Sequence, residues 1–360
     1  MIDLYQKISI LGPDAQYDTC GPRDFGQTTN IPGVYNAKIN GRTCRLFKVL
    51  QTNSCQNNCR YCAFRRDRDR SRISATPDEM ASAFDSAHRR RLVDGLFLSS
   101  GIVINPDTTM TKMIDTVHLL RRNYRYQGYV HLKIMPGSSS STIREAVKIA
   151  NRISLNIESP TESDLSYLSP DKNLKSGFFA TLFEIKKQIR QIKFYGLKTP
   201  SVTTQFVVGA GTEKDQDIVR STSLLYQQFG LKRVFYSAFR PIADTPLATR
   251  PAVSLVRQNR LYQSDFLMRF YRFSPDDLTF DIFGNLLDTL DPKLAWANRH
   301  PEIYPVNLNR GSYWNLLKVP GIGPTSAQKI VKLRQSSPLS SSRLSGLRLQ
   351  LTKILPYVSF

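Results

Sequence analysis

The strongest constraint on the fold is a regular alternation of strand-like and helix-like segments between residues 45 and 237. Short apolar runs predict six strands, at residues 45–51, 95–99, 129–134, 153–157, 202–208 and 233–237. The segments between them predict helices at residues 76–93, 108–126, 141–150, 162–168, 174–195 and 213–229. Strands that alternate with long helices pair in parallel through right-handed crossovers. The chain is therefore predicted to be an α/β protein with six β/α units.

Three cysteines follow the first predicted strand. Cys55, Cys59 and Cys62 are separated by three and then two residues, in a chain with five cysteines in all. Iron–sulfur clusters are normally held by cysteine thiolates, and this spacing lets one loop present three thiolates to a [4Fe–4S] cluster. Three ligands leave one iron open, which is where chemistry is expected. The alternative is a structural zinc loop with Cys20 or Cys44 as fourth ligand, although no second paired spacing accompanies the triplet.

The Cys-x3-Cys-x2-Cys spacing, with Tyr61 before the last cysteine, resembles the signature of radical S-adenosylmethionine (SAM) enzymes. The resemblance implies an open (β/α)6 partial TIM barrel and a [4Fe–4S] cluster whose open iron chelates SAM. In that family, one electron from the cluster cleaves SAM to methionine and a 5′-deoxyadenosyl radical, which takes a hydrogen atom from the substrate. Tyr61 is implied at the edge of the adenine.

The resemblance also implies a SAM pocket at the carboxyl ends of the strands, where ligands of α/β sheets bind. It implies backbone contacts to SAM from the residues after the second strand and a polar side-chain contact to SAM from the residue after the fourth. After the fifth strand, it implies glycines that lie against the adenine of SAM. The structural alternatives are an ordinary strand exit and a helix-capping or ion-paired glutamate. The implied residues are Ser99, Ser100, Gly101, Glu158, Gly209 and Gly211.

Alternating arginines and aspartates follow the cysteine loop directly. Arg65, Arg66 and Arg68 are candidates to hold the SAM carboxylate or a substrate phosphate, because guanidinium groups bind such anions in bidentate geometry. Charges at this density also mark solvated or mutually paired surfaces, which is the competing interpretation.

The chain is strongly basic, with a formal net charge of +21. Basic residues continue to the end of the chain, whereas no Asp or Glu follows Glu302. A C-terminal segment with basic but no acidic side chains predicts a polyanionic partner, with nucleic acid favoured over an anionic membrane surface.

Residues 316–330 resemble a helix-hairpin-helix DNA-binding motif, with a Pro-Gly-Ile-Gly turn between two apolar helices. The glycines permit a tight turn at a helix N-terminus, where backbone N–H groups form a phosphate site. Such contacts position a nucleic-acid backbone and read no sequence. The alternative is a hairpin that docks protein. The implied contact residues are Lys318, Gly321, Ile322, Gly323, Thr325 and Lys329.

Together these segments resemble a family of bacterial radical SAM proteins, named for DNA modification or repair, that carry a C-terminal helix-hairpin-helix. That resemblance implies action on DNA, a uracil-DNA-glycosylase-like partner, and an electron donor such as flavodoxin or ferredoxin. Two alternatives stay open. One is a non-catalytic iron–sulfur protein that binds nucleic acid or senses redox state, and the other is a radical SAM enzyme acting on tRNA or protein.

Four segments are expected: an N-terminal extension (1–40), a radical SAM core (41–247), a helical connector (248–304) and a helix-hairpin-helix module (305–360). Within the connector, helices are predicted at residues 253–273 and 276–290. The absence of an apolar spanning segment and of a disulfide framework favours a soluble protein in the reducing cytoplasm.

Overall fold

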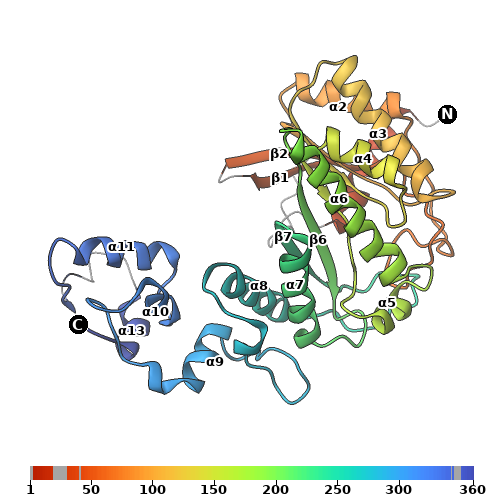
Figure 1. Ribbon diagram of the computed structural model, residues 1–360. Coiled ribbons are helices and arrows are strands. Elements are labelled where there is room, and N and C mark those ends of the chain that lie inside the picture. The colour runs from red at the N-terminus through yellow and green to blue at the C-terminus, as the bar shows by residue number, and fades with distance from the viewer. Residues whose placement is uncertain (1–2, 19–30, 40–41, 342, 344–349) are drawn as a thin grey trace. The chain divides into compact units, whose positions relative to one another are not determined.

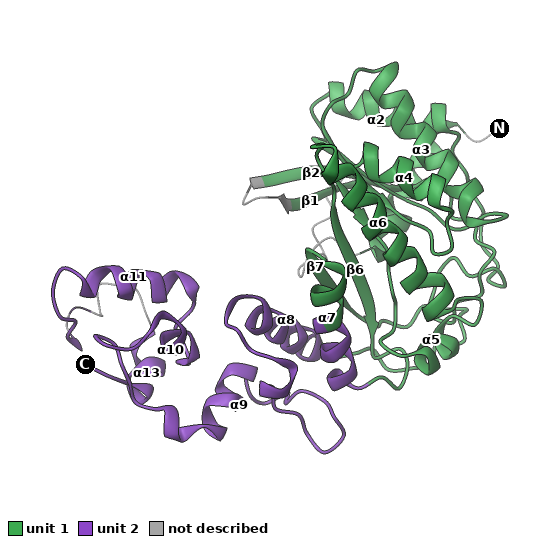
Figure 2. Ribbon diagram, in the orientation of Figure 1, with its two compact units in different colours: residues 1–213, 224–254 green, residues 214–223, 255–360 purple. Residues whose placement is uncertain are grey.

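The computed structural model describes residues 3–18, 31–39, 42–341, 343 and 350–360 (Figure 1). The chain divides into two compact units. Unit 1 comprises residues 1–213 and 224–254, and unit 2 comprises residues 214–223 and 255–360 (Figure 2). No helix in the described ranges is long and apolar enough to cross a membrane.

Unit 1 contains one open sheet of seven strands. In order across the sheet, these are β1 (Val34–Ile39), β2 (Arg42–Leu50), β3 (Gly95–Ser99), β4 (Tyr129–Lys133), β5 (Arg152–Ser154), β6 (Ser201–Val208) and β7 (Arg233–Ala238). Strands β2 to β7 are all parallel, which confirms the six predicted β/α units. Strand β1 was not predicted, and it pairs antiparallel with β2 at one edge.

Helices connect the parallel strands and pack against their neighbours. They are α2 (Pro77–Arg89), α3 (Pro106–Arg122), α4 (Ser140–Ile149), α5 (Glu162–Leu168), α6 (Ala180–Phe194) and α7 (Asp215–Phe229), and α1 (Leu4–Asp14) precedes the sheet. Helix α2 begins with a capping box, in which Thr76 Oγ1 accepts from Glu79 N and the Glu79 carboxylate accepts from Thr76 N. The segment predicted as one helix from residue 174 begins with a π-helical turn, Leu174–Phe179, before α6.

The register places polar side chains in rows across the sheet. Lys48 on β2 pairs with Phe97 on β3, and Phe97 pairs with His131 on β4. Their rings and ammonium group pack together, with Phe97 and His131 stacked at 4.3 Å between centroids. Because strand side chains alternate between faces, residues two positions later share this face. Ser99 and Lys133 are these next residues, so a polar row lies at the carboxyl ends of the strands.

Unit 2 is mostly helical. Its described elements include α8 (Leu255–Phe270), α9 (Pro292–Arg299), α10 (Tyr313–Lys318), α11 (Pro324–Arg334), α13 (Leu351–Ile354) and a parallel pair, β8 (Val306–Asn307) and β9 (Val358–Ser359). A small core, which includes Leu316, Leu317, Ile322, Ala327, Ile330 and Ile354, joins α10, α11 and α13. The sequence of residues 344–358 also predicts a second, degenerate half of a hairpin, and residues 344–349 of it lie outside the described ranges.

The helix predicted at residues 276–290 is wrong. Only a single 3-10 turn, Pro275–Asp277, forms there, and Phe280 then bridges Leu286. Asp281 Oδ1 accepts from the backbone N–H groups of Phe283 and Asn285, and Gly284 has φ +82°. An Asp side chain that binds nearby N–H groups, together with a left-handed glycine, favours a turn over a helix, whatever the apolar content of the segment.

Candidate active site

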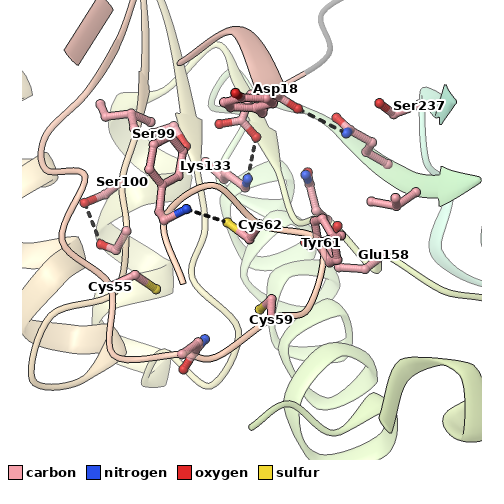
Figure 3. Close-up of a pocket in the computed structure, with 18 of the residues that line it drawn as sticks. Asp18, Cys55, Cys59, Tyr61, Cys62, Ser99, Ser100, Lys133, Glu158 and Ser237 are labelled. Carbon is pink, nitrogen blue, oxygen red and sulfur yellow. Dashed lines mark hydrogen bonds and ion pairs between the residues drawn. The ribbon is translucent and has the colours of Figure 1, made fainter. Parts of the chain in front are cut away.

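The three cysteines of the triplet line one cavity of about 570 Å³ in unit 1. The cavity lies at the carboxyl ends of the parallel strands, because its wall includes residues at or just beyond the ends of β2, β3, β4, β6 and β7. Figure 3 shows Cys55, Cys59 and Cys62 around a shared space, with Tyr61 and Glu158 on one side and Ser99 and Ser100 on another. The cavity therefore lies at the carboxyl ends of the parallel strands, where a ligand pocket was predicted.

Backbone hydrogen bonds attach the cysteine loop to the segment after β3 and to the end of α5. Gln56 N donates to Ile102 O at 2.7 Å, and Arg60 N donates to Leu168 O at 2.8 Å. Two thiols also accept backbone hydrogen bonds, Cys55 Sγ from Ile102 N at 3.5 Å and Cys62 Sγ from Phe64 N at 3.4 Å. The positions of the thiols are therefore fixed by the chain itself.

Gly101 is required by the close approach of this loop. A Cβ atom at Gly101 would lie 2.1 Å from Ser54 O and 3.1 Å from Cys55 Cβ. Gly101 N also donates to Thr52 O at 2.8 Å. Gly101 lines the cavity as predicted, and its lack of a side chain additionally lets the cysteine loop pack against the end of β3.

Arg72 is a site residue that sequence reasoning missed. Its guanidinium group lies beneath the loop and donates hydrogen bonds at 2.6 to 3.3 Å to backbone carbonyls on both sides of the last cysteine. One planar group with five donors can satisfy several carbonyls that no regular element could pair. The accepting carbonyls belong to Asn53, Phe64, Arg65, Arg66 and Arg68.

Burial controls the protonation of the thiols. Burial raises the pKa of Cys59, while the nearby Lys172 ammonium opposes the rise. Burial and the charge of Cys59 raise the pKa of Cys62 to about 12. The free thiols of Cys59 and Cys62 would stay protonated at neutral pH, so binding cationic iron would be coupled to release of their protons. Lys172 lies where it can offset part of the charge of three thiolates.

The thiol arrangement fits a multi-iron cluster. In the part of the chain that the structure describes, no three His, Cys, Asp or Glu side chains converge as single-ion ligands. Thiols that face one cavity without converging on one point suit separate irons of a cube better than a shared zinc ion. Cys44 stands on β2 beside Arg45 and Asp94, at the opposite end of the strand, so it is not the fourth ligand of such a zinc site. Cys20 lies outside the described residues.

Glu158 enters the cavity from a strained position. Its backbone has φ +71°, a region that non-glycine residues rarely adopt, and backbone hydrogen bonds to β6 hold it there. The residue is 5% exposed, and its Oε1 accepts from Lys172 Nζ at 3.4 Å. Burial and the nearby charge of Glu158 raise the pKa of Tyr61 well above its usual value, so the phenol stays neutral. The Glu158 carboxylate, the Lys172 ammonium and the Tyr61 phenol thus lie close together in the cavity.

A second charged pair lies deeper in the same cavity. The Lys133 ammonium forms an ion pair with the Asp18 carboxylate (Figure 3). Burial opposes both charges, yet Lys133 lowers the pKa of Asp18 and Asp18 raises the pKa of Lys133, so both groups remain ionised. Gln205 and Ser237 also line the cavity. Sequence reasoning missed these groups, although the alternation of each strand could have indicated Lys133.

The structure places some predicted residues away from the cavity wall. Gly209 N and Gly211 N both donate to the carboxylate of Glu213, and Arg250 donates to both carbonyls. The backbone N–H and C=O groups of this glycine loop are thus hydrogen-bonded to side chains of the same protein. The loop does not line the described cavity.

The arginines after the triplet are likewise engaged within the loop region and do not line the described cavity. Arg65 Nε donates to Asn58 Oδ1 at 2.8 Å, and Arg66 Nη1 donates to Gln56 O at 3.3 Å. Arg68 donates to Ala243 O and Ala63 O at 3.0 and 3.2 Å. These guanidinium groups mainly satisfy an irregular backbone.

Residues 49–225 match the family model of the radical SAM superfamily. The chain contains a radical SAM domain. This superfamily uses a [4Fe–4S] cluster and SAM as cofactors, and the three thiols of the cavity are the groups that would hold the cluster here. No curated protein matches the chain.

Solved structures are similar to part of the chain at low sequence identity. The FeFe-hydrogenase maturase HydG from Carboxydothermus hydrogenoformans is 15% identical, with 61% of this chain and 50% of that chain covered and a TM-score of 0.49. Methylornithine synthase (PylB) is 14% identical, with coverages of 61% and 60% and a TM-score of 0.49. A radical SAM methyltransferase from Sphaerobacter thermophilus is 14% identical, with coverages of 64% and 65% and a TM-score of 0.47. The chain thus spans about half to two thirds of their lengths.

Proposed function

We propose that this protein is a radical SAM enzyme that acts on nucleic acid, with DNA as the expected substrate class. The observation that carries this proposal is a tight hairpin between two helices in the basic C-terminal region. The proposal also includes a uracil-DNA-glycosylase-like partner and a flavodoxin or ferredoxin as electron donor.

The hairpin is built around one left-handed glycine. Gly321 has φ +86°, and a Cβ there would lie 2.9 Å from Ile354 Cγ1. Ile322 is 1% exposed, and Ala327 and Ile330 on α11 are fully buried. These contacts fix the turn between α10 and α11, so the N-terminus of α11 has a defined position.

That N-terminus has the chemistry of a phosphate site. Gly323 is the N-cap of α11 and supplies no side-chain cap, so the first backbone N–H groups are not capped from within the helix. Thr325 and Lys329 are exposed on α11. Lys318 lies over the ring of Trp296 at 5.0 Å from its centroid, which orients the ammonium at the other side of the hairpin. A nucleic-acid phosphate matches this set of donors.

The residues of unit 1 define what the cavity can do with a substrate. When bound, the cluster and SAM supply a 5′-deoxyadenosyl radical that abstracts hydrogen from carbon. Cys55, Cys59 and Cys62 would hold the irons. Glu158 offers an acceptor for a hydroxyl or ammonium group of the cofactor, and Lys172 forms an ion pair with that carboxylate at 3.4 Å.

The test combines turnover with binding. The anaerobically reconstituted, reduced protein should form 5′-deoxyadenosine from SAM, and DNA should increase the yield, whereas Cys59→Ala should abolish it. Binding of a fluorescent duplex should weaken in Lys318→Glu and Lys329→Glu, with a smaller salt dependence, because each phosphate contact contributes to counterion release. Lys193→Glu, which changes the charge equally at an exposed position in unit 1, should bind normally.

The proposal would be refuted if DNA neither bound nor affected turnover while tRNA or a protein did. A protein that carries a cluster and binds DNA, yet forms no 5′-deoxyadenosine with or without DNA, would instead support the non-catalytic alternative.

A further inference from the structure

Unit 2 holds a second pocket, which nothing in the radical SAM chemistry uses. It is open, has a volume of about 570 Å³, and lies between α8 and the start of α9. We call it the α8 pocket. The lining residues that matter here are Asn259, Arg260, Gln263, Phe266, Tyr271 and Lys293.

One face of α8 supplies the amide and aromatic groups. Asn259, Gln263 and Phe266 are spaced by four and three residues, so their side chains project from the same side of the helix. Asn259 is exposed and Phe266 is 47% exposed. The Phe266 ring also lies 4.7 Å from the Phe270 ring between centroids, so two partly exposed rings lie together on this helix.

Arg260 fixes one of these amides. Its Nη1 donates to Gln263 Oε1 at 2.9 Å, while Nε and Nη2 donate to Leu287 O and Asp288 O at 3.2 and 2.8 Å. The Gln263 amide oxygen therefore accepts a hydrogen bond from within the protein, which leaves the amide NH₂ group to donate to a ligand. Arg260 keeps a positive charge at the pocket rim.

Two residues that line the α8 pocket also contact the hairpin. Lys293 Nζ donates to Ile322 O at 2.6 Å and lies 4.8 Å from the ring centroid of Tyr271. The Tyr271 hydroxyl in turn lies 3.4 Å from where a Cβ on Gly323 would stand. Lys293 and Tyr271 thus connect the pocket directly to the proposed phosphate site. A strand held there would have its neighbouring nucleotide within reach of the pocket.

The chemistry of the lining selects the occupant. A ring for stacking, amides for the edges of a base and a guanidinium group for phosphate are groups that hold an unstacked nucleotide, and Phe266, the two amides and Arg260 supply them. The one carboxylate of the lining, Asp291, caps α9 by accepting from Lys293 N and Leu294 N at 2.9 and 3.3 Å. It therefore opposes an anionic ligand less than a free carboxylate would.

We propose that the α8 pocket binds a single unpaired base of the DNA whose backbone the hairpin holds, so that unit 2 prefers DNA with a disrupted pair. This inference rests on the proposed binding of DNA by the hairpin.

The experiment compares two DNA probes on the full-length protein. One is a fully paired duplex, and the other is the same duplex with a single bulged 2-aminopurine. The bulged duplex should bind about 5- to 150-fold more tightly, which is the range that stacking of one base on an aromatic ring gives. Phe266→Ala and Asn259→Ala, at exposed positions, should reduce this preference and leave binding of the paired duplex unchanged. The change in 2-aminopurine fluorescence on binding should disappear in Phe266→Ala.

Phe283→Ala is the matched control, since Phe283 is an exposed aromatic residue of unit 2 that does not line the described pocket. Equal binding of both probes by the wild-type protein would overturn the α8 pocket proposal and leave the proposed function standing. A preference that survives Phe266→Ala, or an equal loss for both probes, would also overturn it. If neither probe binds, the proposed function fails first, and this inference fails with it.

Discussion

Replacing Gly101 by alanine should damage the cluster site more than its small volume suggests. The new Cβ would stand 2.1 Å from Ser54 O, a backbone atom next to the first cluster cysteine. A carbonyl oxygen in the chain cannot rotate away as a side chain can. Either the end of β3 or the cysteine loop must move.

The size of the movement follows from the distance. Ordinary contacts begin at about 3.4 Å, so the two segments must separate by roughly 1.3 Å from the 2.1 Å of the unrelaxed substitution. Overpacking of this kind costs about 1 to 3 kcal/mol of stability. A shift of that size at Cys55 also misplaces one of three thiolates, so iron binding should fall more than stability does.

The assay is anaerobic reconstitution followed by iron and sulfide analysis, visible absorbance and thermal unfolding. Gly177→Ala is the control, because a Cβ at Gly177 meets nothing within 4 Å and its residue lies in a helical turn. Alanine there should raise stability by about 0.4 to 1 kcal/mol and leave the cluster intact. Full iron content and an unchanged melting temperature in Gly101→Ala would refute the reasoning.

Two further predictions concern other residues. Arg72→Lys should lower the unfolding free energy by about 3 kcal/mol and reduce iron content, because an ammonium cannot replace five carbonyl contacts. The control is Arg89→Lys, at an exposed ion pair, which should change the unfolding free energy by less than about 1 kcal/mol. Equal effects of the two substitutions would contradict this prediction. Burial lowers the pKa of Lys293 from 10.5 to about 7, against the opposing charge of Asp291. The unfolded chain therefore binds more protons between pH 7 and 10.5, so this residue's contribution to stability rises with pH across that window and is flat below it. Chemical unfolding at pH 7 and 9 should show an increase of about 2 kcal/mol from this source, absent from Lys293→Met, and parallel pH profiles of the two proteins would contradict it.

The order of elements in unit 1 could be predicted from sequence because each β/α unit is a local pattern. Gly95 to Ser99, for example, is a short buried apolar run between two polar helices, and the strand has those bounds. Strand β1 was missed because its short sequence, Val-Tyr-Asn-Ala-Lys-Ile, is interrupted by two polar residues and owes its pairing to β2. The helix wrongly predicted at residues 276–290 shows the opposite error. The prediction gave more weight to the apolar content of the segment than to its turn-forming residues, Asp281 and Gly284.

The candidate site was predictable only where its residues are adjacent in sequence. The three cysteines and Tyr61 belong to one loop, so their spacing carries the signal. Lys172, Asp18 and Lys133 reach the same cavity from separate parts of the chain, and no local pattern joins them. Arg65, Arg66 and Arg68 were expected to bind ligand, yet the carbonyls and acids of the loop region occupy them, a demand that only the folded backbone reveals.

The contacts of Arg72 have a consequence for the life of the enzyme in air. A loop whose carbonyls are satisfied by its own chain keeps its shape when its metal is lost, because no ligand bond is needed to order it. Oxygen could therefore strip the cluster without unfolding the protein. We therefore expect the vacated chain to remain a template on which iron and sulfide can be reassembled, so that the polypeptide can serve again after its cofactor is lost.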